Sequence, residues 1–171
     1  TWFWDFFARE SWENLDKNFM WMEIKYKRLY KTAQKTIDSW NNNFMLLKDL
    51  WQNIDKIFNE NEISKTYVFF PDPWDNKDRQ KKHKLFQTKF IRDLAFITKK
   101  WWKLIFKTDH LNYFKQTLEL FEENTDIWEK WFYSFDYEKD FEWFTKKNIT
   151  EFESFFRWEN IKINYVEFIK K

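Results

Sequence analysis

The sequence contains no glycine and no cysteine, and only two of its 171 residues are proline. Without cysteine the chain has no disulfide framework, no thiolate metal ligand and no cysteine nucleophile. Its two histidines, His83 and His110, lie far apart in the sequence, so we expect no metal site. Long apolar runs and a basic-then-apolar N-terminal pattern are also missing, which favours a cytoplasmic location and no membrane segment.

The missing glycines are the most informative absence. Average usage of about 7% predicts about 12 glycines in a chain of this length, yet the sequence has none and has 13 tryptophans. Trp40 and the Trp101-Trp102 pair follow helix-like runs, where a residue with left-handed backbone is expected and glycine has no steric penalty. We hypothesise that many tryptophans stand in place of glycine, because one reassigned stop codon is read as glycine in some genetic codes and as tryptophan in others. The alternative is an aromatic-rich natural or designed chain.

The chain is long enough for one domain with a sizeable core. Its formal net charge is +2, and 34% of its residues are charged, as in an ordinary soluble protein. No binding partner follows from the net charge alone.

Short strands and helical patterns alternate along the first 123 residues. We predict strands at 18–23, 44–47, 67–70 and 103–107, and helices at 5–10, 25–39, 54–59, 85–99 and 112–123. This alternation is typical of a mostly parallel sheet with helices on both faces. The period-two segments 132–135 and 161–168, joined by a charged aromatic segment, predict an antiparallel strand pair at one sheet edge. The sequence therefore predicts a single doubly wound α/β domain over residues 1–171.

Four acidic residues follow predicted strands: Glu23, Asp49, Asp72 and Asp109. In doubly wound folds, ligands bind at the carboxyl ends of the strands. A single acid at such a place is more often a helix cap or a solvated loop residue. Four in succession favour a ligand site.

The third of these acids lies in a distinctive motif, Phe70-Pro71-Asp72-Pro73-Trp74. The two prolines keep the chain extended as it leaves a buried strand, and so fix the place of the carboxylate. Six of the next ten residues are Lys, Arg or His, namely Lys77, Arg79, Lys81, Lys82, His83 and Lys84. A basic run is most often a solvated surface, but next to an aromatic and a strand-end acid it suits an enzyme that acts on nucleic acid.

This motif and the basic loop resemble the signature of the tRNA (guanine-N7)-methyltransferase family. The resemblance extends, in the same order, to segments 1–4, 22–24, 48–50, 108–110 and 150–153, which look like the glycine-rich first motif, two acidic strand ends, a Thr-Asp pair and a Thr-x-x-Glu motif. It implies a Rossmann-like class I methyltransferase fold with S-adenosylmethionine as cofactor and tRNA as partner. It also implies that the first strand precedes Thr1, so we expect the sequence to lack its natural N-terminus.

The resemblance implies a role for each matching residue. Asp72 would be the catalytic carboxylate, acting by positioning and charge stabilisation, because guanine N7 has a free lone pair and needs no base. The cofactor would be bound by Trp2, Trp4, Glu23, Asp49 and Asp72. The guanosine would be bound by Lys77, Asp109, Thr150 and Glu153, and tRNA phosphates by Arg79, Lys81 and Lys82. The loop is one residue longer than is usual, so the substrate-binding lysine falls at 76 or 77, and we choose Lys77 for its charge.

Three alternatives stay open. The chain could be a non-catalytic RNA-binding remnant, since indoles at Trp2 and Trp4 would fill space that glycine leaves for the cofactor. It could be a methyltransferase for another RNA, or an aromatic-rich structural protein without a site. Neither the tRNAs used nor the oligomeric state follows from the sequence.

Overall fold

The computed structural model describes residues 4–37, 42–74, 82–134 and 149–171. The chain divides into two compact units. The first consists of Thr1–Trp51 and Trp143–Glu159, and the second of Gln52–Glu142 and Asn160–Lys171. We describe each unit by itself. No helix within the described ranges is long and apolar enough to cross a lipid bilayer.

The first unit has a two-stranded parallel sheet. Its elements are α1 (Trp4–Glu13), β1 (Phe19–Met22), α2 (Tyr26–Ile37), β2 (Phe44–Leu47) and α8 (Glu151–Trp158). The strands β1 and β2 pair in parallel from Phe19↔Phe44 to Met22↔Leu47. The buried Phe7 of α1 packs edge-on against Phe19, Trp21 and Phe44, with ring centroids 5.7–6.3 Å apart. One aromatic side chain therefore holds the first helix on both strands.

A buried asparagine connects α1 with β2. The Asn43 side-chain nitrogen donates to the backbone carbonyls of Ser11, Asn14 and Lys17 at 2.8–3.1 Å. These carbonyls lie at the end of α1 and in the turn after it, where helical partners are lacking. Asn43 therefore fixes the entry into β2 in a segment that has no glycine.

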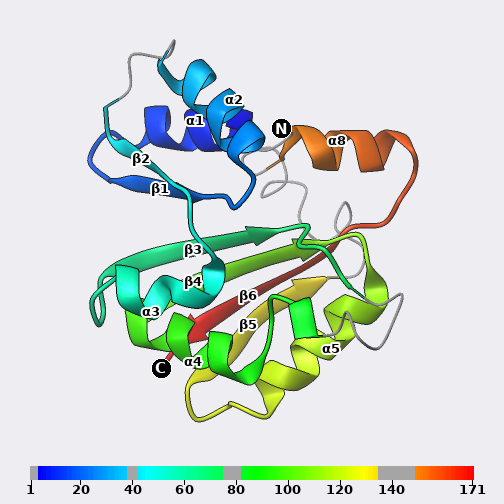
Figure 1. The fold of residues 1–171 in the computed structure, drawn as a ribbon. Helices are drawn as coiled ribbons and strands as arrows, with labels where there is room; N and C mark the ends of the chain where they lie inside the picture. The colour runs from blue at the N-terminus through cyan, green and yellow to red at the C-terminus, as the bar shows by residue number, and fades with distance from the viewer. Residues whose placement is uncertain (1–3, 38–41, 75–81, 135–148) are drawn as a thin grey trace. The chain divides into compact units, whose positions relative to one another are not determined.

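The second unit is built on a four-stranded mixed sheet in the order β3-β4-β6-β5 (Figure 1). Its strands are β3 (Ile63–Phe69), β4 (Thr98–Thr108), β5 (Trp128–Ser134) and β6 (Asn164–Lys170), and its helices are α3 (Ile54–Ile57), α4 (Thr88–Ile97) and α5 (Leu111–Glu122). A short 3-10 turn, η1 (Trp51–Asn53), leads into α3. The strands β3 and β4 are parallel, whereas β6 is antiparallel to both of its neighbours.

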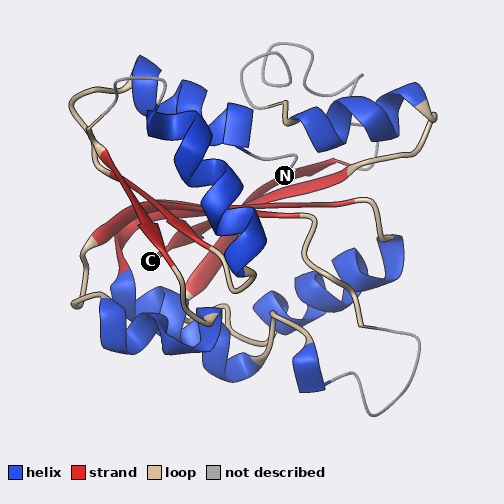
Figure 2. Ribbon diagram, turned by 45° about the horizontal axis from the view of Figure 1, so that its top comes forward, coloured by secondary structure: helices blue, strands red, loops and turns tan. Residues whose placement is uncertain are grey.

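An aromatic core lies between this sheet and the helices α4 and α5, which cover one of its faces (Figures 1 and 2). Phe106 of β4 is fully buried against Phe86 and Tyr113, with centroids 4.8 and 6.0 Å apart. Phe121 of α5 stacks on Phe168 of β6 at 3.7 Å. Such rings contribute large apolar areas and orientation-dependent contacts, and they keep the strand ends in fixed register.

The predicted α/β fold with an antiparallel pair at one sheet edge is confirmed, since β6 and β5 form that edge. The prediction missed α8, which lies in the segment that we interpreted as a charged aromatic connection. It also ended the helix 85–99 too late and began it too early, because α4 spans Thr88–Ile97. That a single domain spans residues 1–171 stays a prediction.

The strand β4 begins five residues earlier than predicted because it carries a large bulge. Ile63 pairs with Thr98 but Lys65 pairs with Lys103, so two steps along β3 correspond to five along β4. Trp101 lies in this bulge with φ 67°, in the left-handed region that favours glycine, and 65% of the residue is exposed. This backbone supports the hypothesis that glycine belongs at Trp101.

Candidate active site

Asp72 and Asp109 lie at the carboxyl ends of two neighbouring parallel strands. Phe69 at the end of β3 pairs with Lys107 of β4, and the Phe70 backbone N–H donates to the Lys107 carbonyl at 2.8 Å. Phe70 has φ 47°, which turns the chain out of the sheet directly before Pro71. Both carboxylates are exposed. The second unit therefore presents two acids at one edge of its sheet, where doubly wound folds bind ligands.

Trp74, the last residue of the motif, contacts His83 of the basic run. The rings of Trp74 and His83 lie 5.5 Å apart at an interplanar angle of 50°. Trp74 is partly exposed and has φ 49°. Trp74 therefore offers part of a flat apolar ring to solvent, two residues after Asp72 in the chain.

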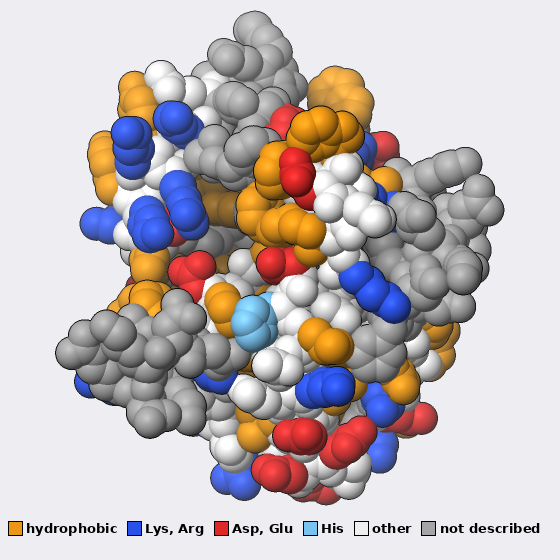
Figure 3. All heavy atoms as spheres, turned by 90° about the vertical axis from the view of Figure 1, so that its right-hand side faces the viewer, with side chains coloured by type: hydrophobic (Ala, Val, Ile, Leu, Met, Phe, Trp, Pro, Cys, Tyr) orange, Lys and Arg blue, Asp and Glu red, His pale blue; other side chains and the backbone are white. Residues whose placement is uncertain are grey.

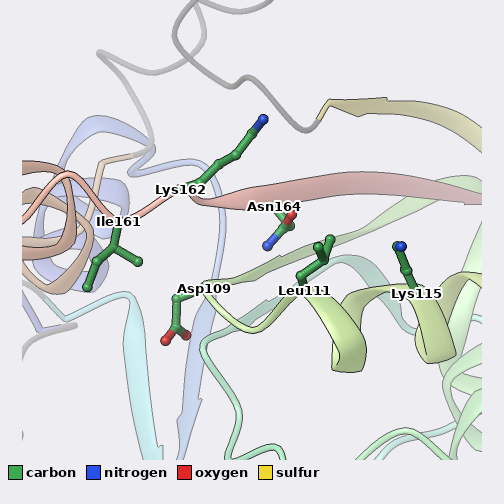
Figure 4. A pocket seen from close by; sticks show the side chains of 6 residues that line it. All are labelled: Asp109, Leu111, Lys115, Ile161, Lys162 and Asn164. Atoms are coloured by element: carbon green, nitrogen blue, oxygen red, sulfur yellow. The ribbon is translucent and has the colours of Figure 1, made fainter.

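An open pocket of about 470 Å³ lies beside Asp109 (Figure 4). It is lined by Asp109, Leu111, Lys115, Ile161, Lys162 and Asn164. Figure 4 shows the Asp109 carboxylate and the Lys115 ammonium group at opposite ends, with Leu111 between them. The pocket thus offers a hydrogen-bond acceptor at one end, an apolar middle and cations at the other end and along one side.

The backbone around Asp109 is held by buried polar contacts. His110 caps α5, because its Nδ1 accepts from the Tyr113 backbone N–H at 3.2 Å. The Thr108 hydroxyl accepts from the His110 backbone N–H at 3.1 Å, and the buried Asn164 side chain donates to the Thr108 carbonyl at 3.1 Å. These contacts join the end of β4, the start of α5 and the start of β6, and so give Asp109 a fixed base. They also give His110 a structural role.

A buried polar cluster on one face of the sheet was not predicted. The Lys103 ammonium group pairs with the Glu167 carboxylate at 2.7 Å, and the Tyr165 hydroxyl donates to the same carboxylate. Lys107 is fully buried, with its ammonium group 5.0 Å from the centre of the Phe69 ring. The signal was present in the sequence, since Lys103 and Lys107 interrupt an apolar strand at period-two spacing and therefore share one face.

The basic run after the motif is not uniform. Lys82 is exposed, as expected of a phosphate contact. Lys84 is buried instead, with its ammonium group 2.5 Å from the Gln116 side-chain oxygen and 5.5 Å from the centre of the Tyr113 ring. Lys84 therefore anchors the end of the loop to α5. The predicted substrate and phosphate contacts Lys77, Arg79 and Lys81 lie outside the described residues.

In the first unit, Glu23 and Asp49 follow the paired strands β1 and β2. The Glu23 backbone N–H continues the pairing by donating to the Leu47 carbonyl at 3.1 Å. One Glu23 carboxylate oxygen accepts from the Lys25 backbone N–H at 2.9 Å, and the other lies 3.6 Å from Arg28. An Asp49 oxygen accepts from the backbone N–H of its neighbour in the chain at 2.6 Å. Both predicted cofactor ligands therefore lie at one end of the same small sheet, with their carboxylates held by local contacts.

The other two predicted cofactor contacts, Trp2 and Trp4, belong to the N-terminal segment. Trp2 lies outside the described residues, and Trp4 begins α1 with a side chain outside the description.

The predicted substrate residues Thr150 and Glu153 form the start of α8, and both are buried. The Thr150 hydroxyl accepts from the Glu153 backbone N–H at 3.1 Å, as a helix N-cap. One Glu153 carboxylate oxygen receives the Arg157 guanidinium at 2.9 and 3.3 Å. These contacts join the first and second turns of α8, and a role of either residue in binding substrate stays a prediction.

The chain has the α/β fold of class I methyltransferases, as its likeness to solved methyltransferase structures shows. Among solved structures, the N-methyltransferase NodS from Bradyrhizobium japonicum in complex with S-adenosyl-L-homocysteine aligns with a TM-score of 0.53 over 90% of this chain and 66% of that one, at 7% identity. At this identity the likeness shows the fold alone.

Residues 5–164 match the methyltransferase family Methyltransf_4. Over 88% of its length the chain is 30% identical to a tRNA (guanine-N(7)-)-methyltransferase of Clostridium novyi, covering 69% of that protein. Over 92% of its length it is 36% identical to a bifunctional glycosyltransferase/methyltransferase of Fusobacterium nucleatum, of which it spans about a quarter (24%). The chain belongs to the tRNA (guanine-N7)-methyltransferase family and is a methyltransferase.

Proposed function

We propose that the chain transfers a methyl group from S-adenosylmethionine to N7 of a guanine in tRNA, in the cytoplasm. The observation that carries the proposal is the pair of exposed acids, Asp72 and Asp109, where β3 and β4 end side by side. Asp72 lies in the Phe70–Trp74 motif after β3. Asp109 follows the neighbouring strand β4 and lines the pocket described above.

The chemistry requires little proton transfer. Guanine N7 presents a free lone pair on the major-groove edge of the base, so it attacks without losing a proton. A positive charge then develops on the imidazole ring. A carboxylate near that ring stabilises the charge more in the transition state than in the ground state, which is what accelerates a reaction. Asp72 takes this role, and Trp74 provides a flat surface for a base.

The pocket beside Asp109 suits the rest of the nucleotide. A carboxylate accepts hydrogen bonds from the N–H groups that distinguish guanine from adenine, and Asp109 is exposed for this purpose. The cationic side chains of Lys115 and Lys162 suit a phosphate group. A nucleoside held at both ends is positioned for in-line attack.

The cofactor fits the acids of the first unit. S-adenosylmethionine supplies an electrophilic methyl group on a sulfonium. Glu23 uses one carboxylate oxygen for the Lys25 N–H, and because a carboxylate has about four acceptor sites it can still accept from two ribose hydroxyls. Asp49 accepts from the adenine amino group. We expect the indoles of Trp2 and Trp4 to weaken this binding where glycine would leave room.

Methylation of another RNA is the second candidate, since the fold alone does not select the substrate. The two are separated by incubating the protein and methyl-labelled cofactor with unmodified tRNA or with ribosomal RNA. The nucleosides are then identified by mass spectrometry. N7-methylguanosine in tRNA supports the proposal, whereas label only in ribosomal RNA or at another atom refutes it.

The variant Asp72→Asn tests the role of the acid. It keeps the size of the side chain and removes its charge, so we expect kcat to fall about 10²- to 10³-fold. Asp126→Asn, which removes an exposed acid away from the motif, is the matched control and should keep wild-type activity. Equal activity of the two variants would exclude the proposed role of Asp72.

A further inference from the structure

Helix α2 has a strongly one-sided charge. Between residues 25 and 37 the sequence contains Lys25, Lys27, Arg28, Lys31 and Lys35 and no acidic residue. Lysines four residues apart on a helix face the same side and repel each other. Arg28 is paired with Glu23 at 3.6 Å. No ion pair among the described residues involves the side chain of Lys25, Lys27 or Lys31. The exposed face of α2 therefore carries positive charge that is complementary to an anionic partner.

Two tyrosines lie on the same exposed side of α2. Tyr26 and Tyr30 are 68% and 51% exposed, and their rings stack with centroids 6.4 Å apart at 21°. The Gln34 side chain donates to the Tyr30 hydroxyl at 3.0 Å, and Lys48 lies 6.0 Å from the centre of the Tyr26 ring. The ring pair is thus held in one orientation while it faces solvent.

Cations interleaved with exposed aromatic rings suit a nucleic acid. Lysine ammonium groups neutralise phosphates, and tyrosine rings stack on unpaired bases of any sequence. The helical rise places Lys27 and Lys31 about 6 Å apart along the axis, a spacing of the order of that between successive phosphates on one strand. Figure 3 shows that Lys and Arg side chains gather in one part of the surface at the upper left of the view.

We propose that the basic face of α2, made up of Lys25, Tyr26, Lys27, Tyr30, Lys31 and Lys48, binds the RNA substrate outside the methyl-transfer site. The identity of the RNA as tRNA rests on the proposed function. The lysines contact phosphates, and Tyr26 and Tyr30 form a platform for an unpaired base. The face supplies affinity and orientation, and it takes no part in the chemical step.

The charge contribution is tested with the double variant Lys27→Gln/Lys31→Gln, since glutamine keeps a similar helix propensity. The dissociation constant for unmodified tRNA is measured over a range of salt concentrations. Each lost phosphate contact lowers the slope of log affinity against log salt by about 1, so we expect the slope to fall by about 2. The control Lys56→Gln/Lys99→Gln removes two exposed lysines of the second unit and should leave the slope unchanged.

The aromatic contribution is tested with Tyr26→Leu/Tyr30→Leu. We expect tRNA affinity to fall about tenfold with an unchanged salt slope, because stacking is lost and charge is kept. Tyr26→Phe/Tyr30→Phe keeps both rings and should restore affinity. Circular dichroism and cofactor titration check that each variant is folded and that the Glu23 region is intact.

The inference is overturned if the Lys27/Lys31 variant and its control give the same slope and affinity, or if the leucine and phenylalanine variants bind alike. These outcomes are independent of the proposed function. A wild-type protein that binds tRNA through this face without forming N7-methylguanosine would refute the proposed function and support the inference. If the wild-type protein forms N7-methylguanosine in tRNA and the α2 variants bind tRNA as tightly as the wild type, the proposed function is supported and the inference about α2 is refuted.

Discussion

The substitution Trp101→Gly tests whether glycine belongs in the β4 bulge. Trp101 has φ 67°, and a non-glycine residue in the left-handed region costs about 1–2 kcal/mol. The indole is largely exposed, so its removal forfeits little burial, but Lys100 lies 5.1 Å from the centre of the ring and that contact is worth about 0.5–1 kcal/mol at an exposed site. We therefore expect Trp101→Gly to stabilise the protein by about 0.5–1 kcal/mol.

The assay is denaturant unfolding of both proteins, with the slope of the transition checked for equality. Trp12→Gly is the matched control, because Trp12 is 60% exposed but lies inside α1, where glycine costs about 1 kcal/mol relative to alanine. Stabilisation at 101 together with destabilisation at 12 is the expected pattern. Equal destabilisation by both substitutions would show that the backbone at Trp101 carries no strain that glycine relieves.

Three further substitutions test the site. Lys115→Gln removes a cation from the pocket of Asp109 and should raise KM for tRNA several-fold with kcat unchanged; a fall in kcat alone would contradict a binding role. Glu23→Gln should weaken cofactor binding about tenfold in a calorimetric titration, and an unchanged affinity would remove Glu23 from the cofactor site. Thr150→Ala removes the N-cap of α8 and should lower the free energy of unfolding by about 0.5–2 kcal/mol, whereas a smaller loss would mean that the capping bond is replaced by water.

The elements that depend on local periodicity could be predicted from the sequence. The bounds of β2 agree with the predicted strand, and each of the four strand-end acids follows an observed strand. Strand ends are readable because an apolar run stops where a polar loop begins. Which strands are neighbours depends on tertiary pairing. The pairing of β3 with β4 places Asp72 and Asp109 after adjacent strands, and the pairing of β1 with β2 does the same for Glu23 and Asp49.

Features that depend on three-dimensional packing could not be predicted. The helix α8 was hidden because half of its residues are aromatic and have weak helix propensity, although Thr150 and Glu153 have the spacing of a capping box. The sequence places Lys84 in the basic run and Lys107 at the end of a predicted strand, but it does not show that both are buried against aromatic rings. Long side chains can bury their stems while the ammonium group finds a partner, and that outcome depends on neighbours far away in the sequence.

The atom that receives the methyl group is tested most directly with tRNA in which guanine is replaced by 7-deazaguanine. This base has a C–H in place of N7 and keeps the edge that contacts Asp109 in our proposal. Under the proposed function, the substituted tRNA binds with nearly the same affinity as normal tRNA and accepts no methyl group, while the unsubstituted tRNA gains N7-methylguanosine. Equal methylation of the two tRNAs would contradict the account.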